Sequence, residues 1–281
     1  MKSLYLEASI ESSKVITNHY STSFSLGIKS LAKRIHAPIY AIYGFVRLAD
    51  EIVDTFHEQD KATLLQEFVN STNQAIQRKI SLNPVLESFQ WVVNHYHIEQ
   101  ELIDAFIKSM EFDLSKKEYD QEGFETYVYG SAEVVGLMCL RVFCEGNEEQ
   151  YQQLKAPAKR LGAAFQKINF LRDLKSDVEE RGRSYFPNLD PSNFTDEKKK
   201  IIEAAIEADF KAGYQGIKNL PSCAKFGVYT AYVYYYALFK KVQKTRAERI
   251  MQERIRVPDF QKYLLLSRSL FLYNIGIILH K

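Results

Sequence analysis

Apolar residues recur at intervals of three and four along most of the chain, which places them on one face of an α-helix. The segment 36–56 shows this spacing clearly, and Pro38 stands in its first turn, where proline suits a helix. Glycine and proline fall mainly between such segments. The pattern therefore predicts an all-α fold with helices over 36–56, 61–79, 83–94, 99–118, 124–144, 157–180, 196–219, 222–254 and 259–279.

The chain shows no linker, repeat, low-complexity tract or alternating strand pattern that would separate a second domain. Its 281 residues, of which 46% are hydrophobic, can fill one large core. The segments 36–56 and 157–180 are apolar around most of their circumference, as expected of helices at the centre of a bundle. We therefore predict a single helical domain over 1–281, in which polar residues on the two central segments need a specific explanation.

Charge is nearly balanced, with 37 Lys and Arg against 35 Asp and Glu. A formal charge of +2 gives no chain-wide field that would favour nucleic acid, so we expect no nucleic-acid partner. Any site for an anion must therefore be built locally.

Three cysteines, Cys139, Cys144 and Cys223, lack the spacing of zinc sites and form an odd set, which favours reduced, buried thiols and a cytoplasmic location. The first ten residues include an acid and no long apolar core, so we predict no signal peptide. Residues 264–280 are apolar but interrupted by polar side chains, and they fall short of the roughly 20 residues that span a bilayer. We expect a packed terminal helix with peripheral contact to a membrane surface.

Two pairs of aspartates carry the strongest chemical signal. Asp50 and Asp54 are four residues apart on one predicted central helix, and Asp173 and Asp177 repeat this spacing on the other. Four residues make about one helical turn, so both carboxylates of a pair project from one face. Twelve aspartates in 281 residues would give about 0.5 such pairs by chance, and these two are the only ones in the sequence.

The second pair continues a polar stripe. Gly162, Gln166 and Asn169 precede Asp173 and Asp177 at helical steps, whereas apolar residues occupy the other faces. A polar stripe between apolar flanks predicts the wall of a cavity. Because like charges one turn apart repel, two such pairs on apolar helices call for a compensating cation.

Carboxylate oxygens suit Mg²⁺, which proteins commonly bind through one or two carboxylates together with substrate phosphates, and Mn²⁺ is an alternative. Arg47 lies one turn before Asp50, and Arg172 is next to Asp173. Both guanidinium groups are therefore candidates to contact the same phosphate oxygens.

A different interpretation stays open for these groups. The aspartates could form solvated faces or ion pairs with the neighbouring arginines. Arg183 and Tyr185 follow the second pair, where they would either close over a phosphate or serve as ordinary turn residues. Gly130, Ala132 and Gly136 weaken a predicted helix, and either a tight helix crossing or space for a ligand would explain them.

Together these motifs resemble the squalene/phytoene synthase family over nearly the whole chain, and they look closest to its bacterial phytoene synthases. The resemblance rests on five segments in the expected order, namely Tyr20-Ser-Thr-Ser-Phe24, Ala41 to Asp54, Tyr129 to Gly136, Gly162 to Asp177, and Gly182-Arg-Ser-Tyr-Phe-Pro187. It implies the all-α isoprenoid synthase bundle with a central active-site cavity.

The resemblance also implies roles for individual residues. The residues expected to hold Mg²⁺ on substrate diphosphate are Asp50, Asp54, Asp173 and Asp177. Those expected to bind or shield the diphosphate are Ser21, Ser23, Arg47, Arg172 and Arg183. Those expected in the catalytic cavity are Tyr43, Tyr129, Gln166, Asn169 and Tyr185. Glu133 stands where many relatives have a small residue, and it is a candidate for an added metal-shell or hydrogen-bonding group.

The implied reaction joins two identical prenyl diphosphates. Mg²⁺ and arginines would stabilise the leaving diphosphate of one substrate, and the double bond of the second would capture the allylic cation as a cyclopropyl diphosphate. A second ionisation and rearrangement would then give the hydrocarbon, between walls that exclude water. No Gly-rich nucleotide fingerprint is present, so we do not expect NADPH and we favour phytoene from two geranylgeranyl diphosphates, in carotenoid biosynthesis.

Two alternatives to this function remain. A squalene or dehydrosqualene synthase would use farnesyl diphosphate, and the sequence does not reveal the depth of the cavity that sets the prenyl length. A non-catalytic member of the family would bind prenyl lipids or a protein partner, although the presence of all four aspartates argues against it. The sequence does not predict the oligomeric state.

Overall fold

The computed structural model describes residues 3–116, 118–187 and 189–274. Its helices are α1 (Leu4–Tyr20), α2 (Thr22–Lys29), α3 (His36–Asp54), α4 (Lys61–Arg78), α5 (Pro84–Tyr96), α6 (Gln100–Ser115), α7 (Gln121–Val128), α8 (Val134–Cys144), α9 (Glu148–Glu179), α10 (Asp196–Asn219), α11 (Ser222–Gln243), α12 (Ala247–Ile250) and α13 (Asp259–Asn274). A π-helical segment, Tyr129–Glu133, joins α7 to α8. The described residues contain no β-strand, only an isolated bridge between Glu118 and Ser184. The all-α prediction is therefore confirmed.

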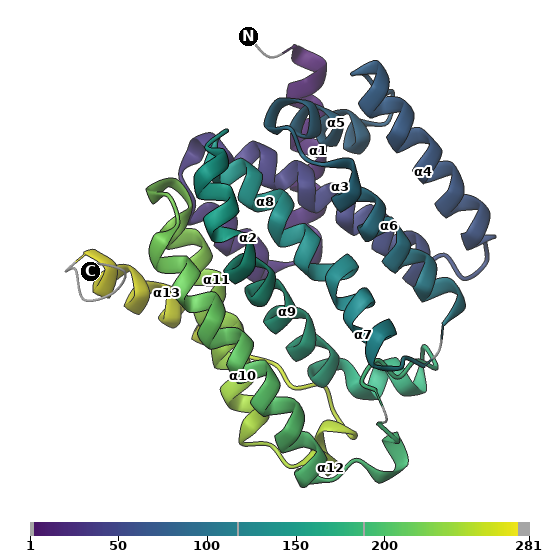
Figure 1. Ribbon diagram of the computed structural model, residues 1–281, viewed down its shortest axis with the longest axis vertical. Helices are drawn as coiled ribbons and strands as arrows, with labels where there is room; N and C mark the ends of the chain where they lie inside the picture. Colours follow the sequence, from purple (N-terminus) through teal and green to yellow (C-terminus); the bar gives the residue numbers. More distant parts are fainter. Residues whose placement is uncertain (1–2, 117, 188, 275–281) are drawn as a thin grey trace.

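The helices pack as a bundle in which α9 lies between α8 and α10 (Figure 1). On the other side, α3 packs against α1, α5, α6 and α8. The core around α3 is aromatic: the ring of Phe45 stacks on that of Phe89, with centroids 3.8 Å apart, and also contacts Phe68 and Phe106. Both predicted central helices are therefore held on several sides, which fixes the side chains that they carry.

Two helices near the N-terminus, α1 and α2, were not predicted. The buried face of α1 includes Ser9, Ser13 and Thr17 beside its apolar residues, so hydrophobic periodicity does not reveal it. A Cβ atom on Gly44 of α3 would lie 2.6 Å from Oγ of Ser13, which means that only small residues fit where α1 crosses α3. Close packing therefore replaces a large apolar stripe at this crossing.

Two predicted helix boundaries are wrong by more than three residues. Helix α9 begins at Glu148 rather than at 157, because the Asn147 side chain caps it by accepting a hydrogen bond from Gln150 N at 3.0 Å. Pro157 therefore lies inside the helix, where it packs against Gly216 of α10. Helix α11 ends at Gln243 rather than at 254, and the short helix α12 follows. The predicted end of the last helix at 279 lies outside the described residues.

The stretch from Gln121 to Cys144 runs as one helix through the π-helical segment. It is long and apolar enough to cross a membrane, but 61% of its most apolar window is buried inside the bundle, as in the core helix of a globular protein.

Cys144 and Cys223 are buried and Cys139 is partly buried, and all three are free thiols as predicted.

Candidate active site

A cavity of about 300 Å³ lies among α2, α3, α8, α9, α10 and α11. Most of its wall is apolar and includes Leu31, Ile42, Phe143, Leu220 and Val228. Five residues predicted from the sequence contribute polar groups to the wall, and they are Ser23, Tyr43, Asp50, Gln166 and Asn169. An apolar chamber with a few polar groups is the usual form of a site for an apolar substrate with a charged head.

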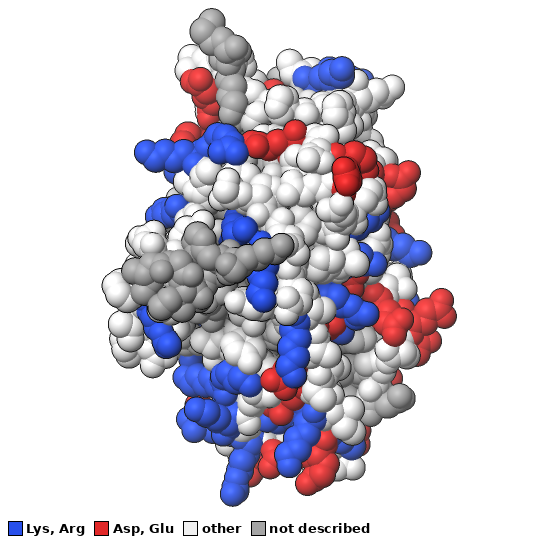
Figure 2. Space-filling view, turned by 60° about the vertical axis from the view of Figure 1, so that its left-hand side comes forward, with Lys and Arg blue, Asp and Glu red and all other residues white. Residues whose placement is uncertain are grey.

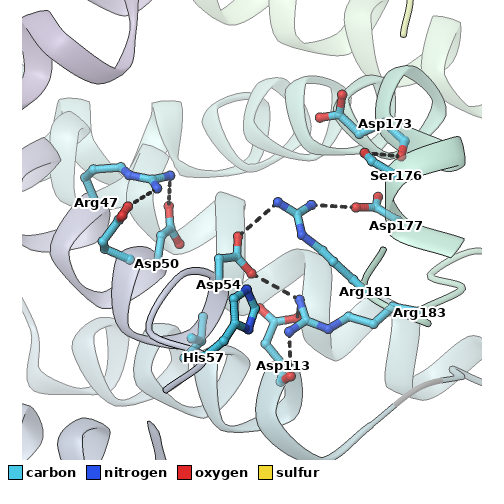
Figure 3. A network of polar contacts seen from close by, with 12 residues as sticks. Arg47, Asp50, Asp54, His57, Asp113, Asp173, Ser176, Asp177, Arg181 and Arg183 are labelled. Carbon is cyan, nitrogen blue, oxygen red and sulfur yellow. Dashed lines mark hydrogen bonds and ion pairs between the residues drawn. The ribbon is translucent and has the colours of Figure 1, made fainter. Parts of the chain in front are cut away.

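The two aspartate pairs face each other from α3 and α9, and Arg181 joins them (Figure 3). Its guanidinium group lies 2.7 Å from Oδ1 of Asp177 and 3.4 Å from Oδ2 of Asp54. One cation thus bridges carboxylates that are far apart in the sequence. Asp54 of the first pair and Asp177 of the second pair therefore lie close to each other in the structure.

Arginines accompany the other two aspartates as well. Arg47 lies 3.8 Å from Asp50, and Nε of Arg172 donates to Oδ1 of Asp173 at 2.9 Å. Arg254, from the segment between α12 and α13, approaches the same carboxylate at 2.6 Å. The ion pairs of the alternative interpretation are therefore present in the structure.

These arginines do not fully offset the cost of enclosing the carboxylates. Burial raises the pKa of Asp50 to about 7 even though Arg47 acts in the opposite direction. Burial likewise raises the pKa of Asp177 to about 6 against the effect of Arg181. A cation of higher charge would favour the ionised form of both groups, so this donor set fits a divalent metal ion.

The chemistry of the donors also suits Mg²⁺ in particular. Each pair offers two carboxylates, the number that Mg²⁺ commonly takes from a protein in addition to waters and substrate phosphates. Among the described residues, no three His, Cys, Asp or Glu side chains come together closely enough to hold a metal ion by themselves.

Arg183 is held deep in the site by a buried network. Its Nη1 lies 3.1 Å from Oδ1 of Asp113 on α6, and its Nη2 donates to the backbone carbonyl of Asp113 at 2.7 Å. The hydroxyl groups of Tyr185 and Tyr127 donate to the same carboxylate at 3.0 and 2.7 Å. Burial raises the pKa of Asp113 to about 6. Arg183 and Tyr185 are therefore anchored parts of the core rather than ordinary turn residues.

Nine of the fourteen predicted site residues lie outside the cavity wall. Four of these nine have further partners, beyond the aspartate network, that account for their positions. Ser21 caps α2, because its Oγ accepts from Phe24 N at 3.1 Å. Arg47 forms an ion pair with Glu51 and lies over the ring of Tyr20 at 4.2 Å. The remaining two are rings with other partners, Tyr129 under the Lys159 ammonium at 4.8 Å and Tyr185 stacked on Phe170 at 4.3 Å.

Glu133 has a structural partner away from the aspartates. Its carboxylate forms an ion pair with Lys159 at 3.2 Å, and it is not among the residues that line the cavity. Burial raises its pKa, with Lys159 acting in the opposite direction. A metal-shell role for Glu133 therefore finds no support in this geometry, whereas pairing with a hydrogen-bonding partner does.

The small residues of the π-helical segment and of the first turn of α8 have two different roles. A Cβ atom on Gly130 would lie 2.4 Å from the carbonyl oxygen of Ala105, so this position is a tight crossing with α6. Ala132 and Gly136 line the cavity instead. Single-turn π-helical segments inside α-helices occur frequently at functional sites.

Three charged residues of the site were not predicted. Arg181 follows Asp177 by four residues, a spacing that could have suggested an ion pair on one helical face. Asp113 had only one weak signal, an acid among the apolar residues of a predicted helix. Arg254 had none, because its contact with Asp173 joins segments 81 residues apart.

Comparisons with known proteins identify the family of this chain. A family model described as squalene/phytoene synthase matches residues 17–261, and the chain belongs to this family. A phytoene synthase of Arthrospira platensis is 23% identical and covers 92% of this chain and 91% of its own length. A presqualene diphosphate synthase of Sinorhizobium fredii is 30% identical over 67% of this chain and 69% of its own length.

A solved structure of a dehydrosqualene synthase in complex with ligand has the same fold. It superposes with a TM-score of 0.82 at 20% identity and covers 96% of this chain and 98% of the other. The fold is thus that of the isoprenoid synthase bundle, as predicted. Membership of the family supports an enzyme of the prenyltransferase type that condenses prenyl diphosphates head to head.

Proposed function

We propose that this chain is a 15-cis-phytoene synthase, which joins two geranylgeranyl diphosphates through a cyclopropyl diphosphate to phytoene. The observation that carries the proposal is the apolar cavity that ends at Asp50, on the same helix as Asp54 and across from Asp177. The likeness to a phytoene synthase over nine-tenths of both chains supports this product. The reaction is redox-neutral, so it needs no NADPH.

In this proposal Asp50 and Asp54 hold Mg²⁺ from α3, and Asp173 and Asp177 hold it from α9. Bound Mg²⁺ would neutralise the negative charge that develops on the departing diphosphate. Arg47 and Arg172 form ion pairs with Asp50 and Asp173. When a diphosphate binds there, the two guanidinium groups would contact phosphate oxygens instead of these carboxylates. Mn²⁺ would satisfy the same ligands.

Side chains of the cavity then protect the allylic cation. The rings of Phe165 and Tyr235 stack with centroids 4.1 Å apart, and both line the cavity. Aromatic rings of the wall would stabilise a cation, and an apolar wall disfavours the water that would quench it. Burial raises the pKa of Tyr43 to about 12, so its hydroxyl keeps its proton and acts as a hydrogen-bond donor rather than as a base.

Gln166 and Asn169 supply neutral polar groups where the apolar wall meets the aspartates. Both residues line the cavity and lie about one turn apart on α9. The side-chain oxygen of Asn169, Oδ1, is buried without a hydrogen-bond partner. A buried acceptor without a partner is costly, so it is suited to receive a hydrogen bond from water or substrate.

We place the reaction in the cytoplasm, at the inner face of the membrane.

The test is turnover by purified protein with Mg²⁺ and geranylgeranyl or farnesyl diphosphate, supplied separately and together. We expect a hydrocarbon that contains both geranylgeranyl chains, and a higher kcat/KM for geranylgeranyl diphosphate. Turnover of farnesyl diphosphate alone would overturn the proposal in favour of a squalene or dehydrosqualene synthase. Folded protein that converts neither substrate would indicate a non-catalytic member that binds prenyl lipids.

The presqualene diphosphate synthase among the relatives suggests a second candidate function. An enzyme of that type would release a cyclopropyl diphosphate instead of a hydrocarbon. Phosphatase treatment of the reaction mixture separates the two outcomes, because only the diphosphate would yield a cyclopropyl alcohol.

A further inference from the structure

Arg181 and Arg183 both contact Asp54, but they are held in different ways. Nη1 of Arg183 lies 3.1 Å from Oδ1 of Asp113, its Nη2 donates to the Asp113 backbone carbonyl, and only 10% of its side chain is exposed. The Arg181 side chain is 39% exposed, and among the described residues its ion pairs are those with Asp54 and Asp177 alone. Arg183 is therefore fixed in the core, whereas Arg181 can leave its position without breaking any other ion pair.

The Arg181 guanidinium group lies between two proposed metal ligands from different helices (Figure 3). Asp54 is the last residue of α3, and Asp177 is in the last turn of α9. The Asp177 side chain is 5% exposed and that of Asp54 is 24% exposed. Carboxylates enclosed to this extent need a positive charge beside them. Arg181 supplies that charge, so a metal ion that binds to both carboxylates has to displace it.

The backbone around Arg181 is fixed, although its side chain is not. The Arg181 N–H donates to the carbonyl oxygen of Ser176 at 3.2 Å, and the Arg183 N–H donates to that of Asp177 at 2.7 Å. Gly182 between them has a φ of +62°, the left-handed conformation with which glycine commonly ends a helix. A change of side-chain rotamer is therefore enough to turn the Arg181 guanidinium away from the aspartates.

Charge on the rest of the surface would not replace cations at the site. Acidic and basic side chains both occur on the face that Figure 2 shows, and 37 Lys and Arg in the chain are nearly balanced by 35 Asp and Glu. A diphosphate must therefore find its positive partners locally. Arg181 is a guanidinium group next to the proposed metal ligands, and such groups bind phosphate oxygens bidentately.

From these contacts we propose that Arg181 is an exchangeable counter-ion, which pairs with Asp54 and Asp177 until Mg²⁺ binds and then contacts the substrate diphosphate. This inference rests on the proposed function, from which it takes both ligands. Arg181 gains phosphate oxygens as partners when it gives up its two carboxylates to the metal. Binding of the metal and binding of the diphosphate should therefore favour each other.

The test measures binding rather than turnover. Equilibrium dialysis of the purified protein gives the affinity for Mn²⁺ alone, and separately the affinity for inorganic diphosphate at saturating Mn²⁺. Arg181→Gln removes the charge, and Arg181→Lys keeps a cation at the same position. The matched control is Arg160→Gln, because Arg160 also lies on α9 or its end and pairs with an enclosed carboxylate, Oδ1 of Asp209 at 3.1 Å.

We expect Arg181→Gln to bind Mn²⁺ alone about tenfold more tightly than wild type, because no cationic side chain competes for the two carboxylates. The same variant should bind inorganic diphosphate about tenfold more weakly at saturating Mn²⁺, because a charged hydrogen-bond donor is lost. Arg181→Lys should bind Mn²⁺ alone as wild type does, since it still competes. Arg160→Gln should match wild type in both measurements.

Two results would overturn the inference and leave the proposed function intact. If Arg181→Gln binds Mn²⁺ no more tightly than wild type, the guanidinium does not compete with the metal. If its affinity for diphosphate is unchanged, Arg181 does not contact this group. Conversely, both predicted shifts in a protein that makes no phytoene would support the exchange and count against the proposed function alone.

Discussion

Nη1 of Arg183 lies 3.3 Å from Oδ1 of Asp54, although 129 residues separate the two in the sequence. Arg183 is in turn fixed by Asp113, so the position of one carboxylate in the site depends on a buried residue of a third segment. The segment that follows α9 therefore contacts the C-terminal end of α3 through this ion pair. This relationship makes Asp113 a positioning residue that can be tested.

Asp113→Ala should lower the free energy of unfolding by about 3 kcal/mol, because it removes the buried carboxylate that pairs with Arg183 and leaves Asp54 as the only carboxylate that pairs with this guanidinium among the described residues. Asp113→Asn keeps an acceptor for the Tyr127 hydroxyl and should cost less. Urea unfolding of both variants measures the difference. An alanine variant as stable as wild type would show that the network does not hold the segment.

Asp50→Ala and Asp173→Ala should each reduce turnover by at least about a hundredfold while leaving the helical content unchanged. Each substitution removes a proposed metal ligand rather than core volume. Asp104→Ala on the exposed side of α6 is the matched control, and it should retain activity. Near-normal product formation by either site variant would refute the metal assignment.

Mg²⁺ binding should depend on pH, because Asp50 has a pKa raised to about 7 and must lose its proton to bind the metal. Affinity for Mg²⁺ in the presence of diphosphate should therefore rise as pH increases from about 5.5 through 7 and level off near about pH 8. Asp177, with a pKa raised to about 6, adds to the slope at the lower end.

Isothermal titration in buffers of different ionisation enthalpy measures the protons that Mg²⁺ displaces. Asp50→Asn carries no such proton and should show a smaller pH dependence than wild type. An affinity that does not change across this range would contradict the assignment of Asp50 as a metal ligand.

Gly136→Leu should reduce the length of substrate that the cavity accepts. Gly136 lines the cavity, and a Cβ atom there would come no closer than 3.4 Å to its neighbours, so a larger side chain would extend into the open space. We expect the ratio of kcat/KM for geranylgeranyl over farnesyl diphosphate to fall by about tenfold. Ala62→Leu on the exposed face of α4 is the control, and an unchanged ratio in Gly136→Leu would show that this wall does not limit chain length.

Much of the fold could be predicted because its central helices repeat apolar residues without interruption. Helix α3 and most of α9 follow directly from that pattern, and so does the position of each aspartate pair on one helical face. Helix α1 could not be found in this way, because Ser13 is buried where large apolar residues would be expected. Its packing depends on Gly44, which only the folded structure brings into contact with it.

The four aspartates of the candidate site could be predicted from the sequence, whereas only some of its arginines could. The aspartates share a helical spacing, which is a local property of the sequence. Arg254 reaches Asp173 from beyond α12, and no local pattern encodes that contact. Tyr185 was expected in the cavity but stacks on Phe170, because burial of its ring and its hydrogen bond to Asp113 direct it into the core.

In the proposed function, both aspartate pairs hold one metal-bound diphosphate at the end of the apolar cavity. A crystal structure with Mg²⁺ and a thiolo analogue of geranylgeranyl diphosphate is the decisive test. We predict Mg²⁺ ligated by Asp50 or Asp54 and by Asp173 or Asp177, with the prenyl chain in the cavity. A diphosphate bound elsewhere, with these carboxylates still paired to arginines, would contradict it.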